Sequence, residues 1–213
     1  MNKQLTKINE LIDWLDANAP EDACVMLLAM SEQPLAEGQS AEERRMEMRS
    51  YMEGFDGDLA DMLVKKFVAI PLLKQVFAEA VARLGVKIEP EMLQKWREKV
   101  KYDLKFDPIE LPEADLPTLE GEPAEHIKRI QEFCLWMAEK PSRNLTLLVL
   151  AQDELNSPKT TFAMGFAPDI AVLLERQMKE NYGLLTVAEA ALYALETRAG
   201  FDEFMAWKDS RKK

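Results

Sequence analysis

The chain has 213 residues, of which 47% are apolar and 31% charged, as is usual for a soluble globular protein. Its 38 acidic and 27 basic side chains give a net charge of −11, which opposes binding to nucleic acids and to anionic membranes. Charges interrupt every apolar run of residues 1–20, so we expect a cytoplasmic protein without a secretory leader or a membrane span.

Helical periodicity dominates the chain from end to end. The first predicted helix has one apolar face, made by Leu5, Ile8, Leu11, Ile12 and Leu15. A second helix is predicted over the apolar run CVMLLAM, which lies between Pro20 and Pro34. Residues 41–53, AEERRMEMRSYME, predict a strongly charged third helix.

Three more helices are predicted before residue 105. Asp56 and Asp58 open the first of them, since carboxylates accept hydrogen bonds from the free N–H groups of a first turn. Pro71 either kinks that helix or begins another that runs to Gly85, and a further helix covers about residues 90–104. We find no convincing run of alternating β-branched residues, and therefore predict no sheet.

Residues 105–124, KFDPIELPEADLPTLEGEPA, predict an acidic linker. Four prolines within this segment exclude a continuous helix and favour extended backbone. The chain is thereby divided into a first helical repeat, 1–104, and a second helical repeat, 125–213.

The two repeats are copies of one another. Residues 8–32 match 130–154 at an offset of 122, and residues 54–81 match 165–192 at an offset of 111. Fourteen of these 53 positions are identical. The change of offset means that the second copy lacks eleven residues. We expect this deletion at the place where the first copy has its predicted helix, 41–53.

A Gly-Phe-x-x-Asp motif recurs in both copies and has a structural interpretation. Glycine suits a left-handed helix end, phenylalanine can staple the next first turn, and aspartate stabilises that turn. The motif consists of Gly54, Phe55 and Asp58 in the first copy and Gly165, Phe166 and Asp169 in the second.

No reactive constellation stands out. His126 is the single histidine and is expected in solvent, and Cys24 and Cys134 are expected to be buried free thiols. Asp56, Asp58 and Asp61 could hold Mg²⁺, but the second copy keeps an aspartate only at the position of Asp58. We therefore assign no catalytic residue, no metal site and no cofactor.

The segment 41–53 is the candidate partner-binding surface. We expect Met48, Tyr51 and Met52 to lie together on one side of this predicted helix and to contact a partner helix. Methionine adapts to irregular partners, and arginines flank these three residues. The candidate residues are Arg45, Met48, Arg49, Tyr51 and Met52.

The resulting interpretation is an all-α protein of two homologous helical units packed with a pseudo-twofold relation. The preferred function is a non-catalytic cytoplasmic adaptor that engages another protein, with homo-oligomerisation left open. A first alternative is a small-molecule or lipid-binding protein with a pocket between the two repeats. A second is an enzyme that uses carboxylates and a divalent cation, and an acidic nucleic-acid mimic is also left open.

Overall fold

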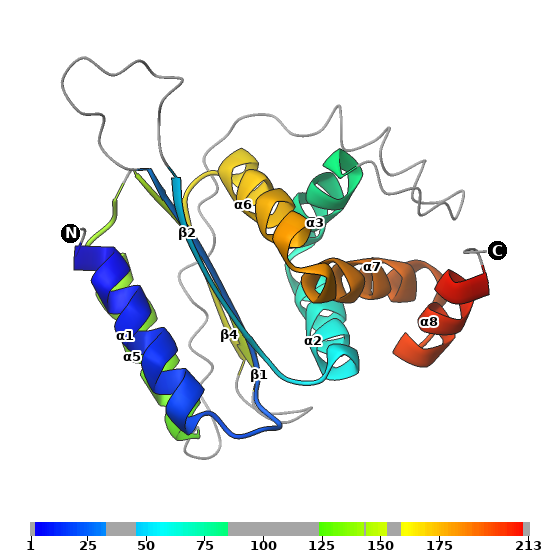
Figure 1. Cartoon of the computed structure of the whole chain (residues 1–213), viewed down its shortest axis with the longest axis horizontal. Coiled ribbons are helices and arrows are strands. Elements are labelled where there is room, and N and C mark those ends of the chain that lie inside the picture. Colours follow the sequence, from blue (N-terminus) through cyan, green and yellow to red (C-terminus); the bar gives the residue numbers. More distant parts are fainter. Residues whose placement is uncertain (1–2, 33–45, 85–123, 143, 153–158, 211–213) are drawn as a thin grey trace. The chain divides into compact units, whose positions relative to one another are not determined.

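A computed structural model describes residues 3–32, 46–84, 124–142, 144–152 and 159–210 (Figure 1). This part of the chain contains seven helices and a four-stranded antiparallel sheet. The prediction of an all-α fold is therefore wrong, and the protein is mixed α/β. The predicted helix at 90–104 lies outside the described residues, as does the predicted linker apart from Ala124.

The chain divides into two compact units, and each sequence repeat contributes to both. Unit 1 comprises residues 1–53 and 108–166, and unit 2 comprises residues 54–107 and 167–213. Each repeat sends a helix and a β-hairpin into unit 1 and a helical pair into unit 2.

Unit 1 is a sheet with two helices on one face. The strands are β1 (Cys24–Glu32), β2 (Met46–Glu53), β3 (Leu145–Gln152) and β4 (Lys159–Met164), in the order β2-β1-β3-β4. The helices α1 (Lys3–Asn18) and α5 (Glu125–Ala138) lie side by side on that face (Figure 1). The first predicted helix is thus confirmed as α1, with Leu5, Ile8, Leu11 and Leu15 buried.

The second predicted helix is instead the strand β1. Its first eight residues are all buried, so neither face of the strand is marked by polar side chains. A short apolar run of this kind fits a buried strand as well as a buried helix, and periodicity cannot separate them. β3 is buried along its whole length in the same way.

The predicted charged helix at 41–53 is also wrong over the part that the structure describes. Residues 46–53 form β2, in which Tyr51 faces α1 and α5 while Met48 and Met52 lie on the opposite face. β4 is its counterpart at the offset of 111, so this element is present in both repeats. The eleven extra residues lie between β1 and β2, outside the described residues.

The register of the central strands agrees with the offset between the two sequence repeats. β1 and β3 are antiparallel neighbours, and their register pairs Leu27 with Val149. These two residues are 122 positions apart, which is the offset between the repeats. Each central strand therefore meets its own equivalent about a local twofold axis at this pair. The outer pairs Val25–Glu53 and Leu147–Met164 are equivalent in the same way.

The core of unit 1 lies between the sheet and its two helices. Ile8 and Ile130 occupy equivalent positions on α1 and α5 and are fully buried, together with Leu27 and Val149 of the sheet. Gln4 Nε2 donates a hydrogen bond of 2.5 Å to the carbonyl oxygen of Lys140, so the start of α1 lies beside the end of α5. The two helices are consequently antiparallel.

Unit 2 is helical, and its main contacts also join the two repeats. Its described helices are α2 (Asp56–Ala69), α3 (Pro71–Arg83), α6 (Ala167–Glu180), α7 (Tyr182–Thr197) and α8 (Phe201–Ser210). α2 packs most extensively against α7, and α3 against α6. Since α6 and α7 are the counterparts of α2 and α3, these two contacts are equivalent. Pro71 begins α3 at its first turn, which decides between the two predicted roles of this proline.

Along the described ranges, each helix is too short or too polar to cross a membrane.

We predict that Tyr51→Phe reduces the loss of stability at alkaline pH. Burial, with the negative charges of Glu53 and Asp16, raises the pKa of Tyr51 to about 12 from an ordinary value of 10.0. As the pH rises from 10 towards 12, the unfolded chain therefore releases this proton while the folded chain keeps it, and stability falls.

Denaturant unfolding below and above pH 10 measures this effect. The variant Tyr182→Phe, which changes an exposed tyrosine, is the matched control and should follow the wild-type pH dependence. Identical alkaline slopes for Tyr51→Phe and the wild type would contradict the prediction.

Candidate functional site

Two equivalent connectors carry the Gly-Phe-x-x-Asp motif. The first follows β2 and leads into α2, and the second follows β4 and leads into α6. At both places the chain passes between the compact units, after Glu53 in the first repeat and after Phe166 in the second.

The glycines of the connectors are required by the backbone. Gly54 has a φ of 118° and Gly165 a φ of 113°, values that residues with a Cβ rarely adopt. A Cβ on Gly165 would also lie 3.2 Å from Thr146 Oγ1 and 3.4 Å from Thr146 Cα on β3. Conformation and space therefore both favour glycine at position 165.

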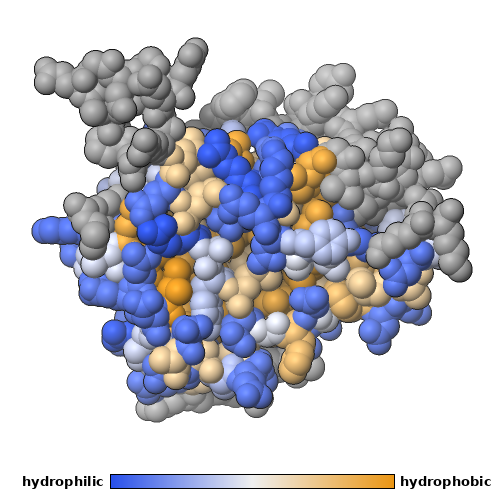
Figure 2. Space-filling view, viewed as in Figure 1, coloured by the Kyte–Doolittle hydropathy of each residue, from blue (hydrophilic) through white to orange (hydrophobic). Residues whose placement is uncertain are grey.

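The phenylalanines of the connectors are mostly in solvent. Phe55 is 69% exposed and Phe166 is 54% exposed, which places both among the large apolar residues most open to water in the described chain. Packing on the first turn therefore does not account for their presence in both repeats. On the face drawn in Figure 2, apolar residues reach the surface in patches between hydrophilic ones.

The aspartates lie in the first turns of their helices. Asp58 on α2 and Asp169 on α6 are exposed, and α2 has no side-chain hydrogen bond at its N-cap. Their carboxylates can still interact favourably with the positive end of the helix dipole. This role is structural and is shared by the two repeats.

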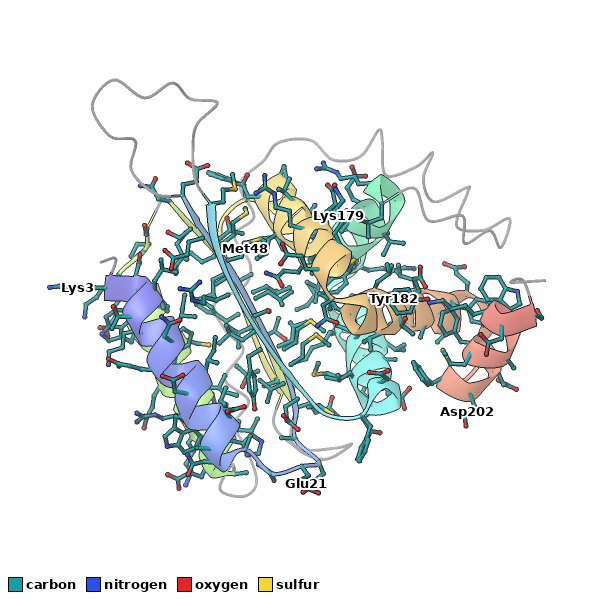
Figure 3. The ribbon with its side chains drawn as sticks, in the orientation of Figure 1. Lys3, Glu21, Met48, Lys179, Tyr182 and Asp202 are labelled. Carbon is teal, nitrogen blue, oxygen red and sulfur yellow. The ribbon has the colours of Figure 1, made fainter. Side chains whose placement is uncertain are left out.

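The structure separates the predicted partner-binding residues. Met48 and Met52 share one face of β2 and pair across the strands with Met30 and Met26 of β1. Figure 3 labels Met48 on this strand. Tyr51 lies on the other face and is part of the core beneath α1 and α5. The methionines are thus brought together in one row, and the tyrosine is not.

Arg49 is held by its own unit. Its Nε donates to Asn9 Oδ1 of α1 at 2.9 Å, its Nη1 donates to the carbonyl oxygen of Met48 at 2.8 Å, and it forms an ion pair with Glu47. Arg45 lies outside the described residues. The candidate surface on β2 therefore consists of Met48 and Met52, with Arg49 committed to α1.

A buried charge pair lies between α7 and α8. Glu189 is 1% exposed and its Oε2 accepts a hydrogen bond of 2.8 Å from Lys208 Nζ, which also donates to Thr186 Oγ1 at 3.2 Å. Burial raises the pKa of Glu189, and Lys208 opposes this shift. Lys208 also lies over the ring of Tyr182 at 4.7 Å.

Two polar side chains are less exposed than their sequence positions indicate. Lys208 belongs to the basic C-terminal run, where cations usually lie in solvent, yet its side chain is 14% exposed. His126 was expected in solvent and is buried. The alignment of the repeats could have indicated that His126 is buried, because at the offset of 122 it corresponds to Gln4. Gln4 is also buried, and it donates a hydrogen bond to the carbonyl oxygen of Lys140 at the end of α5.

Metal-ligating side chains do not gather in the part of the chain that the structure describes. No group of three or more histidine, cysteine, aspartate or glutamate side chains there could hold a metal ion. Cys24 and Cys134 are buried free thiols, and burial raises the pKa of Cys134 to about 12. The Cys134 thiol is therefore not a reactive thiolate near neutral pH.

Comparison with known proteins identifies no relative. No protein-family model matches the chain, and neither the curated proteins nor the solved structures contain a significant match.

We predict that Gly165→Ala destabilises the protein by about 1–3 kcal/mol, because the new Cβ meets Thr146 and the backbone is strained. Gly54→Ala should also be destabilising, because the φ of Gly54 is 118°. Gly200→Ala is the control, since a Cβ there meets no atom within 4 Å, and it should change stability by less than about 0.5 kcal/mol. Denaturant midpoints measure all three. Equal midpoints for Gly165→Ala and Gly200→Ala would show that the connector does not need glycine.

Proposed function

We propose that this protein is a non-catalytic binding protein that engages another polypeptide through its two Gly-Phe connectors. The observation that carries the proposal is the exposure of Phe55 and Phe166 at equivalent positions. The repeats differ at most aligned positions, yet both present a phenylalanine ring to water. Exposed aromatic rings are characteristic anchors of protein interfaces, because each ring buries a large apolar area on binding.

The surrounding structure supports a binding role for these rings. The glycine before each ring is required by its backbone and the aspartate after it can stabilise a helix start, whereas the ring has no comparable task in the fold. The acidic net charge favours solubility and a basic partner. Two free cysteines support a reducing compartment such as the cytoplasm.

The methionine row on β2 is a second contact surface in this proposal. Met48 and Met52 are partly exposed, and their counterparts on β4 are Lys159 and Ala163. A position that accommodates lysine or alanine in one repeat does not need methionine to complete the repeated fold. Methionine at an edge strand is well suited to contact a partner of irregular shape.

We predict that Phe55→Ser and Phe166→Ser each weaken partner binding and that the double variant abolishes it. The stability of the protein should change little, because both rings are largely in solvent. Val68→Ser is the matched control, since Val68 is 69% exposed and its counterpart in the other repeat is Lys179.

Photo-cross-linking in cells of the source organism measures this binding. A benzophenone amino acid placed at position 55 or 166 should give discrete cross-linked species, and one at position 68 should not. The identified partner is then tested against the purified variants. If the double serine variant binds that partner as tightly as the wild type and Val68→Ser do, the proposal fails.

We further predict that converting the β2 surface to the β4 sequence weakens the same association. The double variant Met48→Lys with Met52→Ala places on β2 the residues found at the equivalent positions of β4. Since the fold already accommodates them once, we expect thermal unfolding to change little while partner affinity falls. A large drop in unfolding temperature would instead show that the two methionines are structural.

A further inference from the structure

We propose that two copies of this chain exchange α8, with the turn between α7 and α8 as the hinge. The surface that receives the helix is formed by α7 and α2 of unit 2, where α8 of the same chain packs in the structure (Figure 1). The partner is therefore a second copy of this chain. This inference is separate from the proposed function, because it uses neither the connector phenylalanines nor the methionines of β2.

The turn between α7 and α8 is short and holds one residue in an unfavourable conformation. It consists of residues 198–200, and Arg198 has a φ of 62° and a ψ of 18°. Within the described residues, Arg198 is the one residue other than glycine that has a positive φ. A side chain with a Cβ adopts this left-handed conformation at a cost. Short connections under strain favour exchange between copies, because opening the connection releases the strain.

Arg198 also lies at the point where α7 can continue. Its backbone N–H donates a hydrogen bond of 2.8 Å to the carbonyl oxygen of Ala194, as in an uninterrupted helix. If Arg198 adopts a negative φ, α7 extends past its present end and α8 is directed away from its own docking surface. This rotation leaves the hydrogen bonds of α7 in place. The turn can therefore open without unfolding the helix before it.

The contact between α7 and α8 is specific and mostly buried. Trp207 of α8 stacks on Tyr193 of α7, with ring centroids 4.9 Å apart, and Phe204 of α8 lies beside Tyr193 and is fully buried. Lys208 Nζ donates a hydrogen bond of 2.8 Å to Oε2 of Glu189, a carboxylate that is 1% exposed. Apolar stacking and an ion pair together fix how α8 docks.

An open hinge leaves a surface that needs a replacement for α8. Removal of the helix uncovers apolar surface on α7 and takes from Glu189 the cation that it binds, and both changes are unfavourable. The α8 of a second copy has the same aromatic side chains and the same lysine. It therefore restores each contact on the same surface, while the strain at Arg198 is released in both copies.

A charge exchange between two full-length copies tests the inference. One copy carries Glu189→Lys and the other carries Lys208→Glu, so each copy alone has like charges where α7 meets α8. In an exchanged heterodimer, the altered α7 of the first copy meets the altered α8 of the second, and the two unaltered helices meet each other. Opposite charges then face each other at both places. We expect each variant alone to be monomeric and their equilibrated mixture to contain heterodimers, as measured by light scattering during size-exclusion chromatography.

Two substitutions at the hinge test the strain, and they decide the matter if circular dichroism shows that the charge variants are unfolded. Arg198→Gly relaxes the closed turn and should weaken dimerisation about twenty-fivefold relative to the wild type, which is about fivefold for each of the two hinges. Arg198→Val should strengthen dimerisation, because a β-branched side chain disfavours a positive φ more strongly. Both variants lose the same positive charge, so its loss cannot explain shifts in opposite directions. Sedimentation equilibrium measures the dissociation constants.

The outcomes are decisive for the exchange of α8. Folded charge variants that stay monomeric when mixed would overturn it, and so would equal dimerisation of Arg198→Gly and Arg198→Val, including no dimerisation of either. A dimer that persists unchanged in all these variants joins the copies elsewhere and also contradicts the exchange. The proposed function is measured separately, by cross-linking at positions 55 and 166, and its failure would leave this inference unaffected.

Discussion

The antiparallel pairing of β1 with β3 is the interaction on which the rest of unit 1 depends. It joins the two repeats at the centre of the sheet and pairs Leu27 with its own equivalent, Val149. Each repeat alone would hold only a two-stranded hairpin with its most buried strand at an open edge, and such a hairpin is marginally stable in water. The same pairing brings α1 and α5 onto one face as antiparallel neighbours, where they enclose the core.

Unit 2 is also held together by contacts between the two repeats, here made by helices. α2 packs on α7 and α3 packs on α6, so the main contacts again join one repeat to the other. A sequence repeat is therefore not an independent folding unit in this protein. The connectors at Gly54 and Gly165 are the points at which each repeat passes from one compact unit into the other. Their backbone is constrained by glycine, and the phenylalanine that follows is left open to solvent.

Differences between the repeats mark specialised surfaces, because the twofold arrangement gives each position an internal comparison. Residues kept in both copies, such as Ile8 and Ile130, build the shared core. Other residues occur in one repeat only, and the equivalent position of the other repeat has a different side chain. Met48 and Met52 on β2 belong to this class, as does Glu189, whose counterpart is Ala78. The buried pair of Glu189 with Lys208 attaches α8 to α7, and it is particular to the second repeat.

The amino-acid sequence by itself determined the duplication, the helices with one apolar face and the starts of α2 and α3. The apolar residues between Leu5 and Leu15 recur at the spacing of one helix face, with polar residues between them. Asp56, Asp58 and Pro71 are characteristic of the first turn of a helix. The sequence also singled out the Gly-Phe-x-x-Asp motif, although not the exposure of its rings. Only the tertiary structure decided that residues 24–32 and 46–53 are strands and that Tyr51 and Met48 lie on opposite faces. It also decided that His126 is buried and that Lys208 is half-buried. The reason is physical: sequence periodicity identifies an element only when one of its faces is exposed to solvent and polar while the other is buried and apolar. β1 and β3 have no such contrast, because side chains on both faces of each strand are buried.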